Sequence, residues 1–430
     1  MKIIRNPKRT EWPKILRRPG QDVSDIEEAV RSILQRVKLG GDGAVRELTN
    51  EFDKVDLAST LITRDEIDGA CERVPSELRD AINIAASNIE KFHAAQIDET
   101  KVVETMPGVH CWRKSVPIET VGLYIPAGSA PLFSTVLMLA IPARVAGCSD
   151  VVICTPPNSR GEIHDAVLYA AHLCGVKRMF KIGGAQAIAA MAYGTDSVPR
   201  VDKIFGPGNR FVTLAKQIVS SEVAIDLPAG PSELAVLADG SCEPSFVAAD
   251  LLSQAEHGAD SQVILVSDSE RTVERVVSEV ARQLNDLPRR AIAEESLRCS
   301  RAIIVDGAAA GIDLINFYAP EHLILAVRDV DAIADRVVNA GSVFIGNYAP
   351  ESVGDYASGT NHTLPTAGFA RSMSGVSLDS FVKKITFQKL EPEGLRRLGP
   401  HVECMAKAEE LDAHARAISI RMEALNGREN

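Results

Sequence analysis

The sequence predicts an α/β protein with two parallel-sheet domains. Its 430 residues suffice for more than one domain, at a typical size of about 150 residues each. From about Val121 onward, short apolar runs end in glycine and lead into helical stretches, and this unit returns about every 30 residues. The runs are VGLYIPAG, VVICTPP, MFKIGGAQAIAAMAYG and KIFGPGNRFVTLAKQIV. Strand, tight turn and helix in this repeated order are typical of a parallel sheet covered by helices.

A second series of strands predicts the second domain. Its four apolar segments are separated by helical stretches and lie at 262–266, 302–305, 323–327 and 343–345. The first hundred residues are expected to be helical. One helix begins at a capping box from Ser24 to Glu27 and stops at Gly40 and Gly41, and a second spans about 75–97. The last fifty residues, after the glycine-rich segment 354–375, are expected to form a helical tail.

Composition excludes several classes of protein. Apolar residues make up 45% and charged residues 24%, which is typical of globular proteins and unlike a disordered chain or a coiled coil. The net charge of -11 without a basic patch argues against nucleic-acid and anionic-membrane partners. No run of 18 apolar residues predicts a membrane span, and the eight cysteines form no Cys-x-x-Cys pair. We therefore expect a cytoplasmic protein with reduced thiols.

Two glycine turns are candidate anion sites. The segments 183–186 (GGAQ) and 206–209 (GPGN) each lie between a predicted strand and a helix. Backbone N–H groups and the positive end of the helix dipole can hold a pyrophosphate at such a place. The usual dinucleotide fingerprint, Gly-x-Gly-x-x-Gly with a later acidic residue, is absent from the sequence. The alternative that these glycines only form the turns therefore stays open.

Metal-ligating and acid–base residue types occur in two short motifs. Gln254 and His257 are three residues apart on a predicted helix of about 245–258, so both face one side, although two donors alone do not make a metal site. Glu321 and His322 open a predicted strand and offer two proton acceptors near neutral pH. The alternative for the second motif is a surface glutamate beside a half-buried histidine.

Two further polar segments are open to a functional and a structural interpretation. Asp355 and His362 share the loop GDYASGTNH, which is either a binding loop or a flexible connector. Glu409, Glu410 and His414 lie at the start of the last amphipathic helix. Their spacing is also that of an ordinary intrahelical pair on a solvated helix face.

Taken in order, these segments resemble the histidinol dehydrogenase family. The matching runs are VGLYIPAGSAPLFSTVLMLAIPARVAGC, GGAQAIAA, VDKIFGPGN, DLPAGPSE, DLLSQAEHG, PEHL and GDYASGTNHTLPT. They lie within about 120–370, and the tail continues the match at 408–414. Several long runs in the same order are more specific than any single motif.

The resemblance assigns roles to particular residues. It implies one zinc ion per subunit and NAD as co-substrate, with Glu321 and His322 as the catalytic proton-handling pair. The implied zinc ligands are Gln254, His257, Asp355 and His414. The implied substrate contacts are Ser232, Gln254, His257, His322, Asp355, His362, Glu409 and His414. The implied cofactor contacts are Tyr124, Gln186 and Asn209.

The resemblance also implies an architecture and a reaction. The expected fold has two incomplete Rossmann-like parallel-sheet domains and a small helical tail that reaches the partner in a domain-swapped homodimer. The expected parts are an N-terminal arm 1–20, a zinc and substrate domain 21–123 with 232–376, an NAD-contacting domain 124–231 and the tail 377–430. The expected reaction oxidises L-histidinol to L-histidine through L-histidinaldehyde with two NAD, as the last step of histidine biosynthesis.

Two other functions are alternatives to the one that the resemblance implies. One is a relative in the same superfamily that oxidises another polar alcohol, such as a sulfonated diol, at the same zinc. Glu409 and His362 argue against it, because a pocket built to pair an amine and an imidazole leaves polar groups unpaired with another substrate. The other is a zinc hydrolase or zinc-stabilised binding protein without redox chemistry, for which the sequence has no His-Glu-x-x-His motif.

Overall fold

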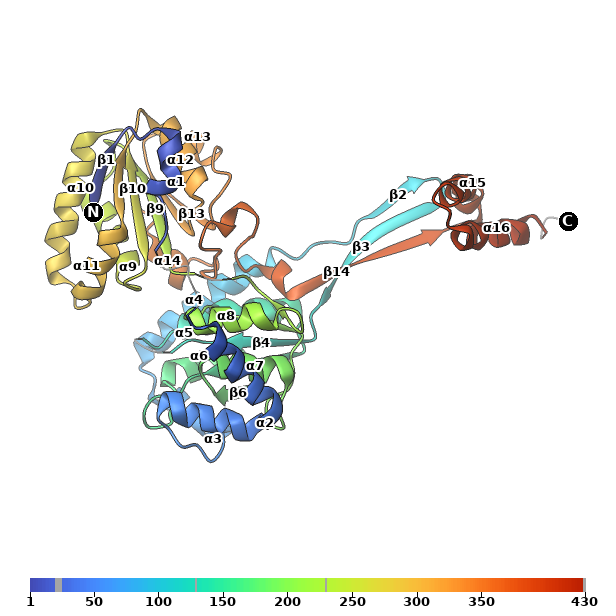
Figure 1. Ribbon diagram of the computed structural model, residues 1–430, viewed down its shortest axis with the longest axis horizontal. Helices are drawn as coiled ribbons and strands as arrows, with labels where there is room; N and C mark the ends of the chain where they lie inside the picture. The colour runs from blue at the N-terminus through green and yellow to red at the C-terminus, as the bar shows by residue number, and fades with distance from the viewer. Residues whose placement is uncertain (20–24, 128–129, 229, 428–430) are drawn as a thin grey trace. The chain divides into compact units, whose positions relative to one another are not determined.

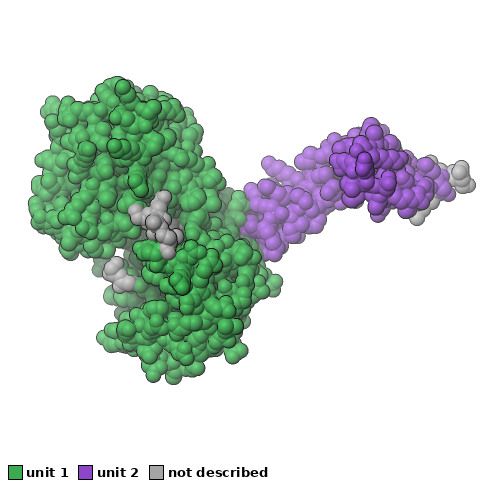
Figure 2. Space-filling view, viewed as in Figure 1, with its two compact units in different colours: residues 1–96, 118–381 green, residues 97–117, 382–430 purple. Residues whose placement is uncertain are grey.

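A computed structural model describes residues 1–19, 25–127, 130–228 and 230–427. The chain divides into two compact units, which Figure 2 shows in different colours. Unit 1 comprises Met1–Gln96 and Ile118–Phe381, and unit 2 comprises Ile97–Pro117 and Val382–Asn430. Within the described ranges, no helix has the length and apolar character needed to cross a bilayer.

The first sheet of unit 1 is parallel and covered on both faces. Its strands are β4 (Thr120–Tyr124), β5 (Asp150–Thr155), β6 (Arg178–Lys181), β7 (Lys203–Phe205) and β8 (Ala224–Ile225), in the order β6-β5-β4-β7-β8 (Figure 1). One face packs against α2 (Glu27–Asp53), α7 (Gly184–Tyr193) and α8 (Arg210–Val219). The other packs against α3 (Arg64–Arg73), α4 (Ser76–Ala94), α5 (Phe133–Ala146) and α6 (Asp165–Leu173).

The second sheet of unit 1 is also parallel. Its strands are β1 (Lys2–Arg5), β9 (Glu233–Ala238), β10 (Gln262–Ser267), β11 (Arg301–Ile304), β12 (His322–Ala326) and β13 (Ser342–Ile345), in the order β1-β11-β10-β9-β12-β13. The helices α9 (Pro244–Ala255), α10 (Glu270–Gln283) and α11 (Arg290–Cys299) share a core on one face. The other face packs against α1 (Trp12–Ile15), α12 (Ala308–Tyr318) and α13 (Val330–Ala334), and α14 (Glu351–Tyr356) follows β13. Because helices cover both faces, β9 and β10 are buried at every position.

Unit 2 is a small antiparallel sheet with two helices. Its strands are β2 (Val102–Met106), β3 (Val109–Pro117) and β14 (Val382–Leu390), in the order β14-β3-β2. Trp112 and Phe387 stack across the β3 and β14 pair with their ring centroids 5.4 Å apart. The chain continues into α15 (Pro392–Ala408) and α16 (Asp412–Asn426), which pack against each other.

The structure confirms the predicted mixed α/β class with parallel sheets and corrects several elements. The tail is not purely helical, because β14 precedes its two helices and pairs with β3. Gly41 breaks the first long helix, as expected, but a second helical stretch continues to Asp53. Asp355 lies on the short helix α14 rather than in a loop. The capping residue Ser24 lies outside the described residues.

Core contacts group the chain differently from the predicted domain boundaries. The helices α2 to α4, expected to belong with 232–376, share their cores with the first sheet instead. The N-terminal arm adds β1 to the edge of the second sheet. Residues 97–117, expected in the substrate domain, form two of the three strands of unit 2. Helix packing and strand pairing between segments distant in sequence produce these differences.

A buried ion pair stabilises the turn after β7. Lys216 on α8 pairs with Asp226, and both side chains are almost fully buried. The Lys216 ammonium donates to the Gly206 carbonyl at 2.9 Å, while the Asp226 carboxylate accepts from the Gly206 N–H at 2.8 Å. Gly206 has a φ of +121°, and a Cβ there would meet the Tyr124 carbonyl oxygen at 2.1 Å. The pair therefore holds a turn that only glycine can form.

We expect Lys216→Met to lower the free energy of unfolding by about 3–5 kcal/mol, because the Asp226 carboxylate is left buried without its countercharge and keeps only the Gly206 N–H. Chemical denaturation followed by circular dichroism measures this change. The matched control is Lys38→Met, which breaks an exposed pair with Glu222 on the same face of the sheet and should change little. Equal denaturation midpoints for Lys216→Met and the unaltered protein would contradict the role of the buried pair.

Candidate active site

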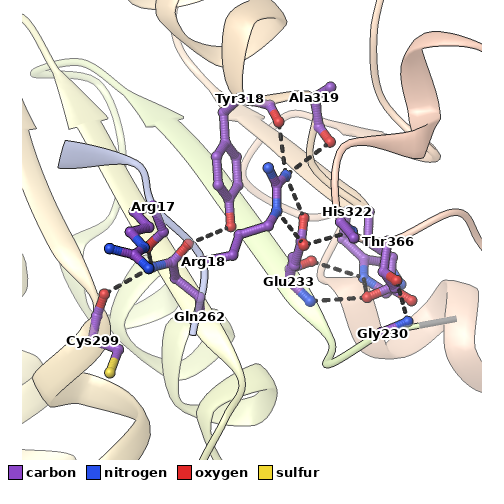
Figure 3. Close-up of polar contacts among 12 residues, drawn as sticks. Arg17, Arg18, Gly230, Glu233, Gln262, Cys299, Tyr318, Ala319, His322 and Thr366 are labelled. Carbon is purple, nitrogen blue, oxygen red and sulfur yellow. Dashed lines mark hydrogen bonds and ion pairs between the residues drawn. The ribbon is translucent and has the colours of Figure 1, made fainter. Parts of the chain in front are cut away.

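Glu321 and His322 lie at the amino end of β12, beside the amino end of the neighbouring strand β9. His322 is the first residue of β12, and β12 pairs with β9, whose first residue is Glu233. The His322 Nδ1 atom lies 3.2 Å from the Glu233 carbonyl oxygen, and the Glu321 carboxylate accepts from the Glu233 N–H at 2.9 Å (Figure 3). A carbonyl can only accept, so Nδ1 carries the proton of a neutral His322 ring. Nε2, for which the described residues supply no hydrogen-bond partner, is left as the basic nitrogen.

Three carboxylates surround the His322 ring. Nδ1 lies 3.6 Å from an oxygen of Glu321 and 3.7 Å from an oxygen of Glu351, and Nε2 lies 3.6 Å from an oxygen of Asp355. The side chains of His322, Glu321 and Glu351 are 8% exposed or less. Among the described residues, neither oxygen of Glu351 has a hydrogen-bond partner. Three acidic groups are therefore concentrated in a place that water hardly reaches.

Burial and mutual repulsion shift the pKa values of this cluster. Burial raises the pKa of Glu321 to about 7 and that of Glu351 to about 8. Burial disfavours the charged ring of His322, but the carboxylates of Glu351, Glu321 and Asp355 outweigh it and raise the His322 pKa to about 10. For Asp355, burial raises the pKa, but the charge of the neighbouring His322 ring outweighs burial and lowers the Asp355 pKa. Glu321 and His322 thus have the environment of proton-transfer groups.

Gln254, His257 and Asp355 are the predicted metal ligands that belong to unit 1. Gln254 lies in the last turn of α9 and is fully buried, and its Nε2 atom is 3.2 Å from His257 Nδ1. The Gln254 Oε1 atom is buried without a hydrogen-bond partner. The charge of His257 helps to lower the pKa of Asp355, so these two groups are electrostatic neighbours. An amide oxygen, an imidazole and a carboxylate form a donor set that suits zinc, and the Gln254 oxygen, which the described residues leave without a partner, fits the role of a cation ligand.

The described residues also contain a second set of possible metal donors. Ligand atoms of His322, Glu351 and Asp355 all lie within 4.8 Å of one another. Glu351 was not singled out from the sequence. It precedes Asp355 by four residues, one helical turn, and this spacing becomes informative only once the segment is known to be a helix. The two donor sets share Asp355.

A pocket of about 860 Å³ joins several other candidate residues. Its lining includes Asn209, Ser232 and His257, so predicted cofactor, substrate and metal residues meet in one cavity. His362 is half-buried, and burial lowers its pKa although the Asp355 carboxylate opposes this. The charge of His362 in turn contributes to the lowered pKa of Asp355. His362 therefore belongs to the same cluster.

The three predicted cofactor residues lie at the carboxyl ends of the first sheet. Tyr124 ends β4, and its hydroxyl accepts from the Gly184 N–H at 3.1 Å, at the start of α7. Gln186 is buried in the first turn of α7. Asn209 caps α8 by accepting from two backbone N–H groups, one of them that of Phe211 at 3.0 Å. Because β4 and β7 are neighbours where the strand order reverses, these residues flank the usual ligand crevice of a parallel sheet.

The two remaining predicted site residues belong to unit 2. Glu409 follows the last residue of α15, and His414 lies in the first turn of α16. Both are exposed. The cluster within unit 1 therefore contains three of the four predicted zinc ligands and lacks the carboxylate predicted to bind the substrate amine.

Fold and site together are those of an α/β enzyme with a buried glutamate and histidine beside oxygen and nitrogen groups of the types that bind cations. The family model for histidinol dehydrogenase matches residues 16–422. The chain is 57% identical to a histidinol dehydrogenase from Bacteroides fragilis over 426 residues, which is 99% of this chain and 100% of the relative. It is 51% identical to one from Escherichia coli over 416 residues, covering 96% and 95%.

A solved structure agrees with these sequence relatives. The crystal structure of a histidinol dehydrogenase from Elizabethkingia anophelis superposes with a TM-score of 0.97 at 52% identity, and 99% of each chain is covered. The chain therefore belongs to the histidinol dehydrogenase family and is an oxidoreductase.

The two donor sets predict opposite results for two matched histidine substitutions. If Gln254, His257 and Asp355 hold the metal, His257→Asn should bind much less than one zinc per chain, because a ligand is lost. His322→Asn should keep its zinc and lose turnover. Metal analysis after dialysis against dilute zinc measures both variants. Normal zinc in His257→Asn, with loss in His322→Asn, would assign the ion to the second donor set.

Proposed function

We propose that the chain is a zinc- and NAD-dependent L-histidinol dehydrogenase that oxidises L-histidinol through L-histidinaldehyde to L-histidine. The observation that carries this proposal is the buried cluster of His322, Glu321 and Asp355 beside the unpartnered oxygen of Gln254. Membership of the histidinol dehydrogenase family supports the choice of substrate. The reaction would be the last step of histidine biosynthesis and would take place in the cytoplasm.

Gln254, His257 and Asp355 would hold the zinc, together with His414 from a tail. Zinc supplies a Lewis-acidic centre that orients the imidazole and amine of histidinol, and NAD supplies the hydride acceptor for both oxidations. Tyr124, Gln186 and Asn209 would contact NAD, where the carboxyl ends of β4 and β7 and the start of α7 offer backbone donors. Ser232 and His362 would contact the substrate.

His322 would take the alcohol proton in the first oxidation. The Glu233 carbonyl holds the Nδ1 proton, so Nε2 can accept a proton from the substrate hydroxyl. Water access is low because the side chain of His322 is only 4% exposed. The aldehyde would stay bound between the two oxidations.

Glu321 would act in the second oxidation. Burial raises its pKa to about 7, so at neutral pH it exchanges a proton readily. We assign it to the activation of the water that hydrates the aldehyde, and His322 again accepts a proton as the hydrate is oxidised. The two residues therefore divide the proton transfers of a four-electron oxidation.

Glu409 and His414 would complete a site from the tail. Glu409 offers a carboxylate to the substrate amine, and His414 offers a fourth zinc ligand. Both residues belong to unit 2. We propose that the tails are exchanged in a homodimer of two incomplete Rossmann-like domain pairs, so that each tail serves its neighbour's site.

Counting NADH tests the proposed function directly. Zinc-loaded enzyme with limiting L-histidinol and excess NAD should form two NADH per histidinol, because the alcohol is carried to the acid without release of the aldehyde. Absorbance at the NADH wavelength gives the count. One NADH per substrate, or turnover of a sulfonated diol in preference to histidinol, would favour the alternative of a superfamily relative. No NADH at all would favour a protein without redox chemistry.

Glu321→Gln should separate the two oxidations. The amide cannot accept a proton from water, so we expect the aldehyde step to slow by about 10²- to 10⁴-fold, with a much smaller effect on the alcohol step. Single-turnover assays started from histidinol and from histidinaldehyde measure the steps separately. Equal slowing of both steps would mean that Glu321 only supports the Glu233 backbone and takes no proton.

A further inference from the structure

We infer that Arg18 and Glu233 are a positioning pair that sets the orientation of the Glu321 and His322 side chains. This inference rests on the proposed function, since it concerns how that reaction's proton-handling residues are held. Neither Arg18 nor Glu233 was assigned a role from the sequence. The side chain of Glu233 is 4% exposed and that of Arg18 is 16% exposed, so this is an ion pair largely withdrawn from water.

Glu233 touches the two proton-handling residues through its backbone. Its carbonyl accepts from His322 Nδ1 at 3.2 Å, and its N–H donates to the Glu321 carboxylate at 2.9 Å (Figure 3). One residue therefore determines both the tautomer of the histidine and the direction of the carboxylate. A shift of Glu233 displaces both groups together.

The Glu233 side chain is held from two directions. Arg18 donates to both of its oxygens, from Nε at 2.5 Å and from Nη2 at 2.8 Å. The Ala367 N–H donates to the same carboxylate at 2.7 Å. Such a bidentate guanidinium pair restrains direction as well as distance. The backbone of Glu233 is thereby anchored at the first residue of β9.

Arg18 also holds the segment that leads into Glu321. Its Nη2 atom donates to the Tyr318 carbonyl at 2.7 Å and to the Ala319 carbonyl at 3.3 Å, and its guanidinium lies 4.1 Å from the centre of the Tyr318 ring. Ala319 has a φ of +53°, a left-handed conformation that costs energy in a residue with a Cβ. Ala319 is two residues before Glu321. Arg18 therefore stabilises the strained segment that leads into Glu321 and β12.

Arg18 thus joins the start of β9 to the segment before β12, the two chain segments that position Glu321 and His322. It lies in the N-terminal arm, far in sequence from β9 and β12. Lysine can replace it only in part, because a single ammonium lacks the planar fork that reaches a carboxylate and two carbonyls at once. A misplacement of about 1 Å in a proton-transfer group is enough to cost about 10²-fold in rate.

The test compares Arg18→Met, Arg18→Lys and Glu233→Gln with the control Arg5→Met in zinc-loaded enzyme with histidinol and NAD. Arg5 lies in the same arm and makes an exposed ion pair with Glu270. We expect Arg18→Met to lower kcat by about 10- to 100-fold, with zinc content and the KM for histidinol nearly unchanged. Arg18→Lys should recover only part of kcat. Arg5→Met should match the unaltered enzyme.

A double-substitution cycle tests whether the two residues act as one unit. Arg18→Met combined with Glu233→Gln should be no slower than the slower single variant, because either change already breaks the pair. Independent effects that multiply would overturn the inference. So would a kcat for Arg18→Met or Arg18→Lys equal to that of the unaltered enzyme, even with a lowered melting temperature, since the pair would then serve stability alone.

The same assay separates this inference from the proposed function. Turnover of histidinol by the unaltered enzyme and by Arg5→Met tests the function before any Arg18 variant is considered. If these two proteins do not turn over histidinol, both proposals are contradicted. If they do, and the Arg18 variants have a normal kcat, only the inference of a positioning pair is contradicted. If Arg18→Met does not fold, Arg18→Lys and Glu233→Gln decide the outcome by the same measure of kcat against KM.

Discussion

The gathering of buried acidic groups around one imidazole is the constraint on which the site depends. Glu321, Glu351 and Asp355 all lie within 4 Å of the His322 ring, and burial raises the pKa of nearby Asp250 to about 7. Buried carboxylates are costly unless cations or donors compensate them. A divalent metal ion and a cationic amino alcohol carry the positive charge that compensates such carboxylates. A cation bound to these carboxylates also weakens their effect on the His322 pKa. Without it, the carboxylates raise the His322 pKa to about 10, so the ring keeps its proton at neutral pH.

The proposed site draws its residues from opposite ends of the two parallel sheets. The proposed proton-handling residues lie at the amino end of β12 in the second sheet, whereas Tyr124 and Asn209 lie at the carboxyl ends of strands in the first. Ligand crevices of parallel sheets usually lie at the carboxyl ends of the strands, and the proposed cofactor residues of the first sheet lie at such ends. In the second sheet, a backbone carbonyl and N–H at the start of β9 hold His322 and Glu321 instead.

The sequence predicts the parallel α/β units well, because their signal is local. Apolar runs that lead through a turn into a helix predicted the first strand series, and apolar segments separated by helical stretches predicted the second. The three-residue spacing of Gln254 and His257 indicated one shared side of a helix, and their side chains lie 3.2 Å apart. The antiparallel sheet of unit 2 was missed, because β14 pairs with β3 more than 260 residues away in sequence. Glu351 and Arg18 were missed for the same reason. Their roles arise from tertiary contacts with His322 and Glu233, which no local pattern records.

Anomalous X-ray scattering at the zinc edge, from crystals of the zinc-loaded protein, tests the central claim most directly. The account predicts one strong peak at bonding distance, about 2.0–2.3 Å, from donor atoms of Gln254, His257 and Asp355. The His322 ring should remain outside the coordination sphere, with Nε2 free to accept a proton. A peak bonded to His322 and Glu351, or no peak within this cluster, would contradict the assignment of His322 as the base.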